Sequence, residues 1–301
     1  MSNIASIIRV NFLPLTIVIV LAGLTGAFYA HRSFNALDAL LVMVGALLTH
    51  ASVNAFNNYF DYRSNIDTRT SKTPFSGGVE VLVSGAMKPS SALAVSVATF
   101  VGAALVGIHF LTLFFNALLP LVLFGALVIV LYSPVLAKIH GVSEVVAGSG
   151  FGFMGLGVYV TQTGIVDGTG FTIFVPVTIL VAMLLFLNEF PDAEIDRDAG
   201  RRHAVILVGK RWASRIYGAA LIATYASIIL SVAFRAAPWT VLVSMLTVPV
   251  AYRAARGALN NYERTAELIP AMGMNVITIL ATILLMAVGF GLSPLLKSVG
   301  F

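Results

Sequence analysis

The chain has 301 residues, of which 58% are hydrophobic and only 10% are charged, and its mean hydropathy is +0.95. Soluble domains carry roughly 25% charged residues, so an ordinary soluble globular protein is excluded. The absence of cysteine excludes disulfides, thiol catalysis and cysteine-ligated metal sites. The net charge of +5 is not gathered on a soluble basic surface, and we expect no nucleic-acid partner.

Apolar stretches long enough to cross a bilayer recur along the whole chain. A membrane-spanning helix needs about 20 apolar residues, and the continuous runs favour helices over a transmembrane β-barrel. No polar linker divides the chain, so we expect one all-α, polytopic membrane domain over residues 1–301, a bundle of nine transmembrane helices around a central cavity. The predicted spans are residues 11–31, 37–58, 91–110, 112–132, 143–163, 171–190, 214–234, 238–256 and 270–292. The third and fourth adjoin near Leu111, which predicts a tight helical hairpin there.

Lysine and arginine fall mostly on one side of this predicted topology. With a cytoplasmic amino terminus, that side holds 15 of the 18 basic residues, leaving Arg32, Arg235 and Lys297 on the other. Because cytoplasmic loops are enriched in basic residues, we expect a multi-pass protein of the cell membrane. Its amino terminus and its two long Asp-rich loops would be cytoplasmic. We expect membrane lipid around it and no obligate protein partner.

The second span ends in a polar segment that reads NAFNNYFDYRSNID. Carboxylates at a membrane boundary are costly unless they are solvated, paired or bound to metal. Asn57 and Asp61 are one helical turn apart and share a helix face. The third ligand is either Asn65, at the regular spacing, or Asp67 after a bulge or helix end; we favour Asp67 because a carboxylate binds a hard dication more strongly. Asn58 is expected to be a polar neighbour rather than a ligand.

The sixth span ends in a second acidic segment, NEFPDAEIDRDAGRR. Asn188, Asp192 and Asp196 stand at i, i+4 and i+8, so they share one face if the helix continues past the membrane. Pro191 is tolerated near a helix break. Three further acids fall on other faces and are expected to be solvated: Glu189, Glu194 and Asp198. A plainer alternative is that Asp192 and Asp196 pair with the arginines that follow them: Arg197, Arg201 and Arg202.

The two segments together have the chemistry of a magnesium–diphosphate site. Carboxylate and amide oxygens without cysteine or histidine select Mg²⁺, which protein carboxylates share with substrate phosphates. The histidines are scattered with no pair at metal-ligand spacing, which argues against zinc or haem. Two Mg²⁺ ions would balance four aspartates and a diphosphate, helped by nearby cations. The candidate cations are Arg63, Arg69, Lys72, Lys138 and Arg201.

The motifs NNYFDYRSNID and NEFPDAEID, on the second and sixth of nine spans, resemble those of the UbiA superfamily of intramembrane prenyltransferases, as does LYSPVLAK. The resemblance implies Mg²⁺-dependent transfer of a polyprenyl group from its diphosphate to an aromatic acceptor. It implies catalytic roles for Asp61, Asp67, Asp192 and Asp196, metal and diphosphate binding by these four with Asn57 and Asn188, and a diphosphate contact for Lys138. The motif wording is most similar to the menaquinone branch, whose acceptors are dihydroxynaphthoates. Asn58 stands where the family usually has Asp.

Other functions remain open on the sequence. The acceptor could instead be a glyceryl-phosphate lipid or a haem precursor, and a cation transporter is the alternative from another class. Transporter carboxylates usually lie near mid-membrane, whereas these lie at one boundary. An apolar chamber would protect an allylic cation from water. Its candidate lining residues are Phe56, Phe60, Phe151, Phe153 and Met154. The small-residue run GSGFGFMGLG is explained by close helix packing.

Overall fold

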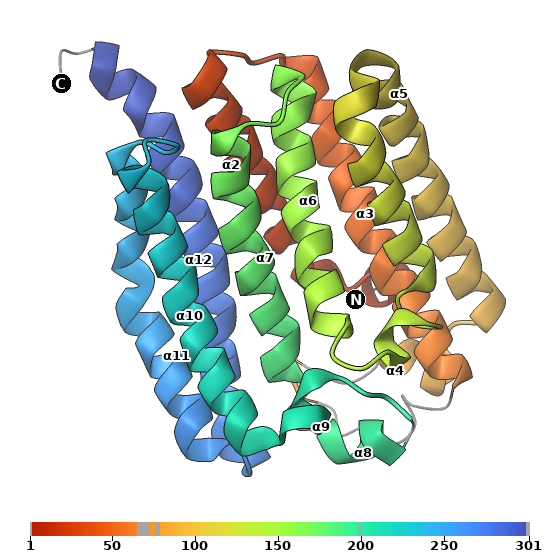
Figure 1. The fold of residues 1–301 in the computed structure, drawn as a ribbon. Coiled ribbons are helices and arrows are strands. Elements are labelled where there is room, and N and C mark those ends of the chain that lie inside the picture. The colour runs from red at the N-terminus through yellow and green to blue at the C-terminus, as the bar shows by residue number, and fades with distance from the viewer. Residues whose placement is uncertain (1, 65–72, 76–78, 199, 299–301) are drawn as a thin grey trace.

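The computed structural model describes residues 2–64, 73–75, 79–198 and 200–298, and these residues form helices and connecting turns without a strand (Figure 1). In chain order the helices are α1 (Asn3–Ile7), η1 (Val10–Phe12), α2 (Pro14–His31), α3 (Ala36–Arg63), α4 (Glu80–Val83), α5 (Pro89–Leu131), η2 (Leu136–Lys138), α6 (Ser143–Thr163), α7 (Gly168–Asn188), α8 (Ala193–Asp198), α9 (Ala204–Val208), α10 (Lys210–Ala233), η3 (Trp239–Thr247), α11 (Val248–Asn261) and α12 (Thr265–Ser298). The predicted all-α class is confirmed.

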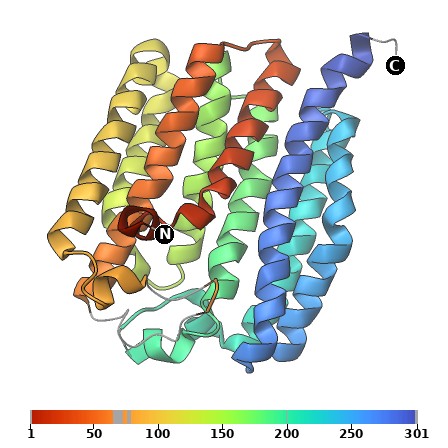
Figure 2. The same cartoon turned by 180° about the vertical axis from the view of Figure 1, so that it is seen from behind.

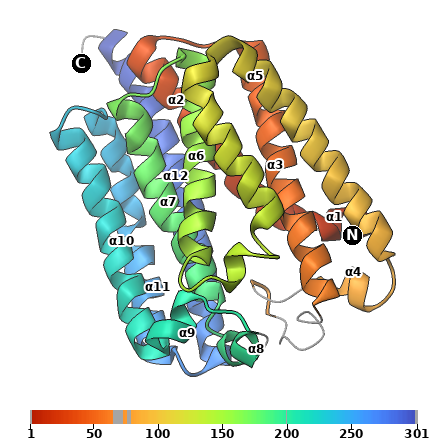
Figure 3. The ribbon, with the colours of Figure 1, turned by 45° about the vertical axis from the view of Figure 1, so that its right-hand side comes forward.

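Seven of these helices are long and apolar enough to cross a membrane. The longest, α5, has 43 residues; a straight helix of that length would measure roughly 65 Å, about twice the thickness of a hydrocarbon core. Its backbone is non-helical at Phe114 (φ −135°, ψ 50°), and there the ribbon turns back on itself, so that two arms run side by side (Figures 1 and 3). The predicted hairpin exists, with its reversal three residues after Leu111.

The predicted span 238–256 is not one α-helix. Residues Trp239–Thr247 form the 3₁₀ segment η3, and α11 begins only at Val248. Pro249 lies in the first turn of α11, where its missing N–H needs no partner. The β-branched residues before it, among them Thr240 and Val241, disfavour an α-helical start. The expectation of a regular helix at this position was wrong.

The long helices stand roughly parallel, with the short helices α4, α8 and α9 gathered at one end of the bundle (Figure 1). Helices α10, α11 and α12 form one side, α3 and α5 the other, and α2, α6 and α7 lie between them, as the reverse view also shows (Figure 2). Neighbours pack as α6 on α7, α3 on α5 and α12 on α2. Both Asp-rich segments therefore reach the same end of the bundle.

Close packing of α6 on α7 depends on glycines four residues apart. A Cβ added to Gly148 would meet the carbonyl oxygen of Thr178 and come within 2.8 Å of the Ala182 Cβ. A Cβ on Gly152 would run into the Thr178 side chain and come within 3.0 Å of a Phe174 ring carbon. The small-residue run thus lets two backbones approach closely, as in other membrane helix pairs.

Gly148→Ala is expected to lower the free energy of unfolding by about 1–3 kcal/mol, because the new methyl group overpacks the α6–α7 contact. Gly157→Ala is the matched control on the same helix, since no atom lies within 4 Å of its added Cβ. That substitution should be neutral or slightly stabilising, because alanine favours helix over glycine by up to about 1 kcal/mol. Thermal unfolding in detergent measures both, and equal melting temperatures for the two variants would refute the packing argument.

Candidate functional site

The two acidic segments meet through one arginine. The guanidinium of Arg201, which follows α8, donates from Nη2 to Asp61 Oδ1 of α3 at 2.6 Å and from Nη1 to Asp196 Oδ1 of α8 at 3.4 Å. Its side chain is 21% exposed and those of Asp61 and Asp196 are 11% and 4% exposed. Burial alone would lower the pKa of Arg201, but the two carboxylates outweigh it and raise that pKa. Residues 140 positions apart in sequence are thereby brought into one site.

Asn57 lies beside Asp61 on the last turns of α3. Its Nδ2 donates to Asp61 Oδ2 at 3.2 Å and to the Ser133 hydroxyl at 2.9 Å. The expected one-turn pairing of Asn57 and Asp61 is therefore present. Asn65 and Asp67, the two alternatives for a third ligand, lie outside the described residues.

The second segment does not continue α7 as one helix. That helix ends at Asn188, a turn containing Pro191 follows, and α8 begins at Ala193. The condition for Asn188, Asp192 and Asp196 to share one unbroken helix face is therefore not met, because Pro191 has no N–H for the helical hydrogen-bond ladder. The Asp196 amide still bonds the Asp192 carbonyl at 2.8 Å, which preserves one turn between those two residues. All three remain at the same end of the bundle.

The structure describes two of the remaining predicted cations, Arg63 and Lys138, and both are exposed. Lys138 is exposed in η2, and the exposed Arg63 donates to the Tyr59 hydroxyl at 3.3 Å. Arg69 and Lys72 lie outside the described residues. The plainer alternative of pairing within the second segment holds only in part, because Arg201 bonds Asp61 of the other segment as well as Asp196.

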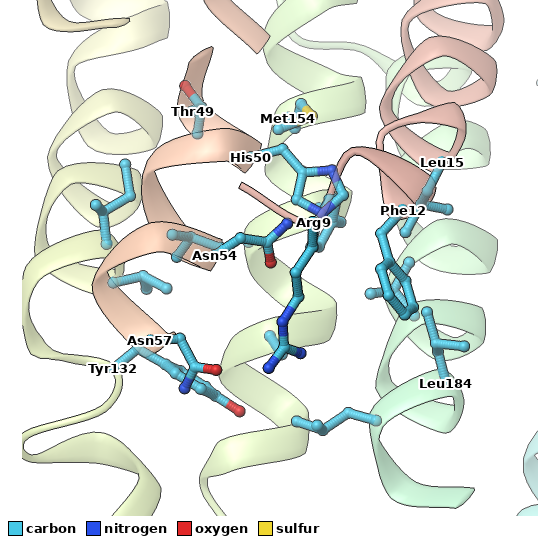
Figure 4. A pocket seen from close by; sticks show the side chains of 18 of the residues that line it. Arg9, Phe12, Leu15, Thr49, His50, Asn54, Asn57, Tyr132, Met154 and Leu184 are labelled. Atoms are coloured by element: carbon cyan, nitrogen blue, oxygen red, sulfur yellow. The ribbon is translucent and has the colours of Figure 1, made fainter. Parts of the chain in front are cut away.

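An apolar cavity of about 200 Å³ opens from the polar end into the bundle (Figure 4). It is lined by η1, α2, α3, the second arm of α5, α6 and α7. Asn57 and Tyr132 lie toward one end of the cavity and Met154 toward the other (Figure 4), and Asn188 and Phe151 also line it. A second cavity of about 240 Å³ adjoins it, with Met154 in both walls.

The five predicted lining residues have different positions. Phe151 and Met154 line the first cavity, Met154 also lines the second, and Phe153 lines the second alone. Phe56 and Phe60 line neither; their rings stack on each other with centroids 6.2 Å apart. The predicted residues that do line a cavity all lie on α6.

Arg9 is a cavity residue that sequence reasoning assigned only to topology. It has a left-handed φ of 51°, uncommon for a residue other than glycine. Its guanidinium donates to Asn58 Oδ1 from Nε at 3.2 Å and from Nη2 at 2.8 Å, and points into the cavity (Figure 4). Asn58 also donates from Nδ2 to the Ile7 carbonyl at 2.8 Å. Asn58 is thus a structural residue that holds the amino-terminal segment in place. In the sequence, the only indication of the Arg9 contact was the polar amide of Asn58.

Asn58→Ala should free the amino-terminal segment, because it removes bonds to Arg9 and to the Ile7 carbonyl. Hydrogen bonds to charged groups contribute about 1.5–3 kcal/mol each. We expect faster tryptic cleavage after Arg9 and a lower melting temperature. Asn11→Ala, at an exposed position of η1, is the control and should change neither. Unchanged cleavage in Asn58→Ala would contradict this role.

Behind Asp196 lies a buried group of two glutamates and a histidine. Glu144, Glu189 and His203 each offer a ligand atom, and these atoms lie within 4.8 Å of one another. Glu189 was expected to be solvated, but it is only 8% exposed, so that expectation was wrong. Burial raises the pKa of Glu189 well above its ordinary value, the neighbouring Glu144 adds to the shift, and Arg201 opposes it.

This geometry places the amide groups of Asn57 and Asn188 in the wall of an apolar cavity, with the Asp61 carboxylate bonded to Asn57 and the Arg201 guanidinium bonded to Asp61. Such a site can hold a polyanionic headgroup at the polar end and an apolar tail beyond it. The Oδ1 atom of Asn188 is buried without a hydrogen-bond partner among the described residues, as expected of a group that faces an absent ligand. Oxygen donors without sulfur suit a hard dication.

Comparison with known proteins identifies the family. The model of the UbiA prenyltransferase family matches residues 17–277. A 1,4-dihydroxy-2-naphthoate octaprenyltransferase of Bacillus subtilis (strain 168) is 28% identical over 269 residues, covering 87% of this chain and 82% of the relative.

Solved structures share the fold. An apo UbiA homologue from Aeropyrum pernix K1 superposes with a TM-score of 0.72 at 20% identity, over 94% of this chain and 98% of that one. A UbiA homologue from Archaeoglobus fulgidus, solved with DMAPP and Mg²⁺, gives a TM-score of 0.64 at 13% identity, over 95% of this chain and 100% of that one.

Proposed function

The chain belongs to the UbiA prenyltransferase family, and we propose that it transfers a polyprenyl group from its diphosphate to an aromatic quinone precursor of the dihydroxynaphthoate type. The observation that carries this proposal is the Arg201 bridge between Asp61 and Asp196, which adjoins an apolar cavity through Asn57: Asn57 bonds Asp61 and lines that cavity. The name of the Bacillus subtilis relative supports the aromatic acceptor.

The residues at the cavity mouth fit Mg²⁺. They offer carboxylate and amide oxygens, and Asn188 has a buried oxygen without a hydrogen-bond partner among the described residues. We assign the binding of two ions to Asn57, Asp61, Asp67, Asn188, Asp192 and Asp196, with Asp61, Asp67, Asp192 and Asp196 essential for catalysis. The Mg²⁺-bound homologue from Archaeoglobus fulgidus supports this choice of ion. When bound, Mg²⁺ would neutralise the negative charge that builds on the departing diphosphate.

The chain's own residues bind the diphosphate, hold the isoprenoid and exclude water from the site. Arg201 leaves Asp61 to bind a diphosphate oxygen, a charge-assisted contact that strengthens as the leaving group gains charge. We also assign diphosphate contacts to Arg63 at the end of α3 and Lys138 of η2, together with Arg69 and Lys72. The cavity walls, with Phe151 and Met154, hold the isoprenoid and keep water away from the allylic cation.

We place the protein in the cell membrane as one domain over residues 1–301. Nine crossings follow if the two arms of α5 each cross and η3 with α11 forms the eighth. The distribution of basic residues supports a cytoplasmic amino terminus and a cytoplasmic active site. Polyprenyl diphosphate would then reach the site from the cytoplasmic leaflet, with its tail in the bilayer.

Purified protein in detergent tests the reaction with three acceptors: dihydroxynaphthoate, hydroxybenzoate and geranylgeranylglyceryl phosphate. Dihydroxynaphthoate alone should give a prenylated product by mass spectrometry. Chelation with EDTA should abolish the product and excess Mg²⁺ should restore it, since the carboxylates cannot hold a diphosphate unaided. Product with hydroxybenzoate instead would refute the dihydroxynaphthoate assignment, and product with geranylgeranylglyceryl phosphate instead would refute an aromatic acceptor. Cation flux in proteoliposomes without prenyl transfer would refute prenyl transfer as the function of this site.

A further inference from the structure

Three segments bring ligand atoms together next to Asp196. Glu144 lies in the first turn of α6, Glu189 follows the last residue of α7, and His203 immediately precedes α9. Their residues are 3%, 8% and 2% exposed. Because the three come from separate segments, no sequence spacing could reveal the group.

Several of these buried atoms lack hydrogen-bond partners among the described residues. Both ring nitrogens of His203 and the Oε2 atom of Glu189 have none. Glu144 is held in place, since its Oε1 accepts from the Ala204 amide at 2.6 Å and its Oε2 from the Ser143 hydroxyl at 2.7 Å. A buried polar atom without a partner costs free energy, so unpartnered atoms aimed at one another indicate a missing ligand.

The spacing of these atoms suits a shared metal ion. His203 Nδ1 lies 3.4 Å from Glu189 Oε2, which is long for a charge-assisted hydrogen bond. Two ligands of a tetrahedral ion, each about 2.1 Å from the metal, are about 3.4 Å apart. On the other side of the ring, His203 Nε2 lies 3.4 Å from Asp196 Oδ2. Metal-bound histidines usually direct their second nitrogen to a carboxylate; Asp196 lies on that side of the ring, although at 3.4 Å the two atoms are not hydrogen-bonded in this structure.

We propose that Glu144, Glu189 and His203 bind a divalent transition-metal ion of the zinc type, and that Asp196 orients the histidine from behind. An imidazole nitrogen among the ligands favours such an ion over Mg²⁺, which prefers oxygen. The proposal does not depend on the acceptor or on the transfer reaction. The ion joins the start of α6, the end of α7 and the start of α9, and so holds Asp196 against Arg201.

A protonated His203 bridging Glu189 and Asp196 without metal is the competing explanation, and metal binding separates the two. The protein is purified with a tag that contains no histidine, loaded with Zn²⁺ or Co²⁺ in excess Mg²⁺, and dialysed. Elemental analysis should find about one transition-metal ion per chain, and Co²⁺ should give the visible absorption of a four-coordinate site.

Two variants remove ligands while keeping volume: Glu189→Gln and His203→Phe. Each should weaken Zn²⁺ binding at least about 100-fold, abolish the Co²⁺ absorption and remove the rise in melting temperature that Zn²⁺ gives the unaltered protein. Glu194→Gln, at an exposed position of the neighbouring α8, is the matched control and should bind the ion normally. Circular dichroism establishes that each variant is folded.

Asp61→Asn separates this site from the diphosphate site. It should lose prenyl transfer yet retain the transition-metal ion, because Asp61 lies on α3 on the far side of Arg201 from Asp196. Unaltered protein that binds no Zn²⁺ in excess Mg²⁺ would overturn the proposal. So would folded Glu189→Gln or His203→Phe that binds Zn²⁺ as tightly as the unaltered protein does.

Discussion

Asp61→Asn is expected to lower prenyl transfer by about 10²–10³-fold or more while leaving the protein folded in the membrane. The substitution keeps the shape of the side chain and removes one negative charge from the cavity mouth. Losing one preorganised electrostatic contact to a developing charge typically costs about that factor. The loss should appear in kcat with dihydroxynaphthoate and a polyprenyl diphosphate, measured at saturating Mg²⁺.

Asp38→Asn provides the matched control for this experiment. Asp38 is in the first turn of α3, at the other end of the same helix, and should retain full activity. Near-normal turnover in folded Asp61→Asn would exclude a catalytic role for Asp61. It would also refute the assignment of diphosphate binding to the end of α3.

Arg201→Gln should both destabilise the substrate-free protein and impair transfer. Without the guanidinium, two largely buried carboxylates, Asp61 and Asp196, face each other across the site without their shared counter-charge. Removing one partner of a buried ion pair typically costs about 3–5 kcal/mol. Partial exposure of Arg201 places the expected loss at the lower end of that range. Mg²⁺ with a prenyl diphosphate should restore part of the lost melting temperature, since cations then replace the missing charge.

Arg197→Gln is the comparison for this variant, because Arg197 is exposed on α8, four residues before Arg201. It should unfold at the normal temperature and turn over normally. A substrate-free Arg201→Gln protein as stable as Arg197→Gln would show that the bridge contributes little to stability. Unchanged turnover would exclude Arg201 from diphosphate binding.

Helix positions followed from the sequence wherever hydrophobic runs were continuous and uninterrupted. Long apolar stretches specify membrane helices almost by length alone. Details that depend on local backbone chemistry were less predictable. The reversal of α5 falls at Phe114 rather than Leu111, and Pro191 ends the helical face that Asn188 and Asp192 were expected to share. The 3₁₀ form of η3 reflects its β-branched residues and the proline in the first turn of α11, which a search for apolar runs overlooks.

The acidic motifs were found because their residues recur at helical spacing, and the structure brings Asp61 and Asp196 to one arginine. Groups assembled from distant segments could not be found that way. Glu189 read as a solvated acid, and its burial against Glu144 follows from how α6 and α7 pack. His203 carried no motif at all. Burial of single polar residues is a property of the assembled bundle, and one sequence does not encode it locally.

The contact between Arg201 and Asp61 has a consequence for the order of substrate entry. In the substrate-free protein Arg201 already bonds Asp61 and Asp196 where we propose that the diphosphate binds, so an approaching prenyl diphosphate meets two carboxylates whose charge one guanidinium only partly compensates. A naked trianion would be repelled, whereas the same anion already complexed by dications could exchange places with the guanidinium at little electrostatic cost. Release of inorganic pyrophosphate would then be assisted when Arg201 bonds Asp61 again, so that the two carboxylates keep a positive partner after the product has left.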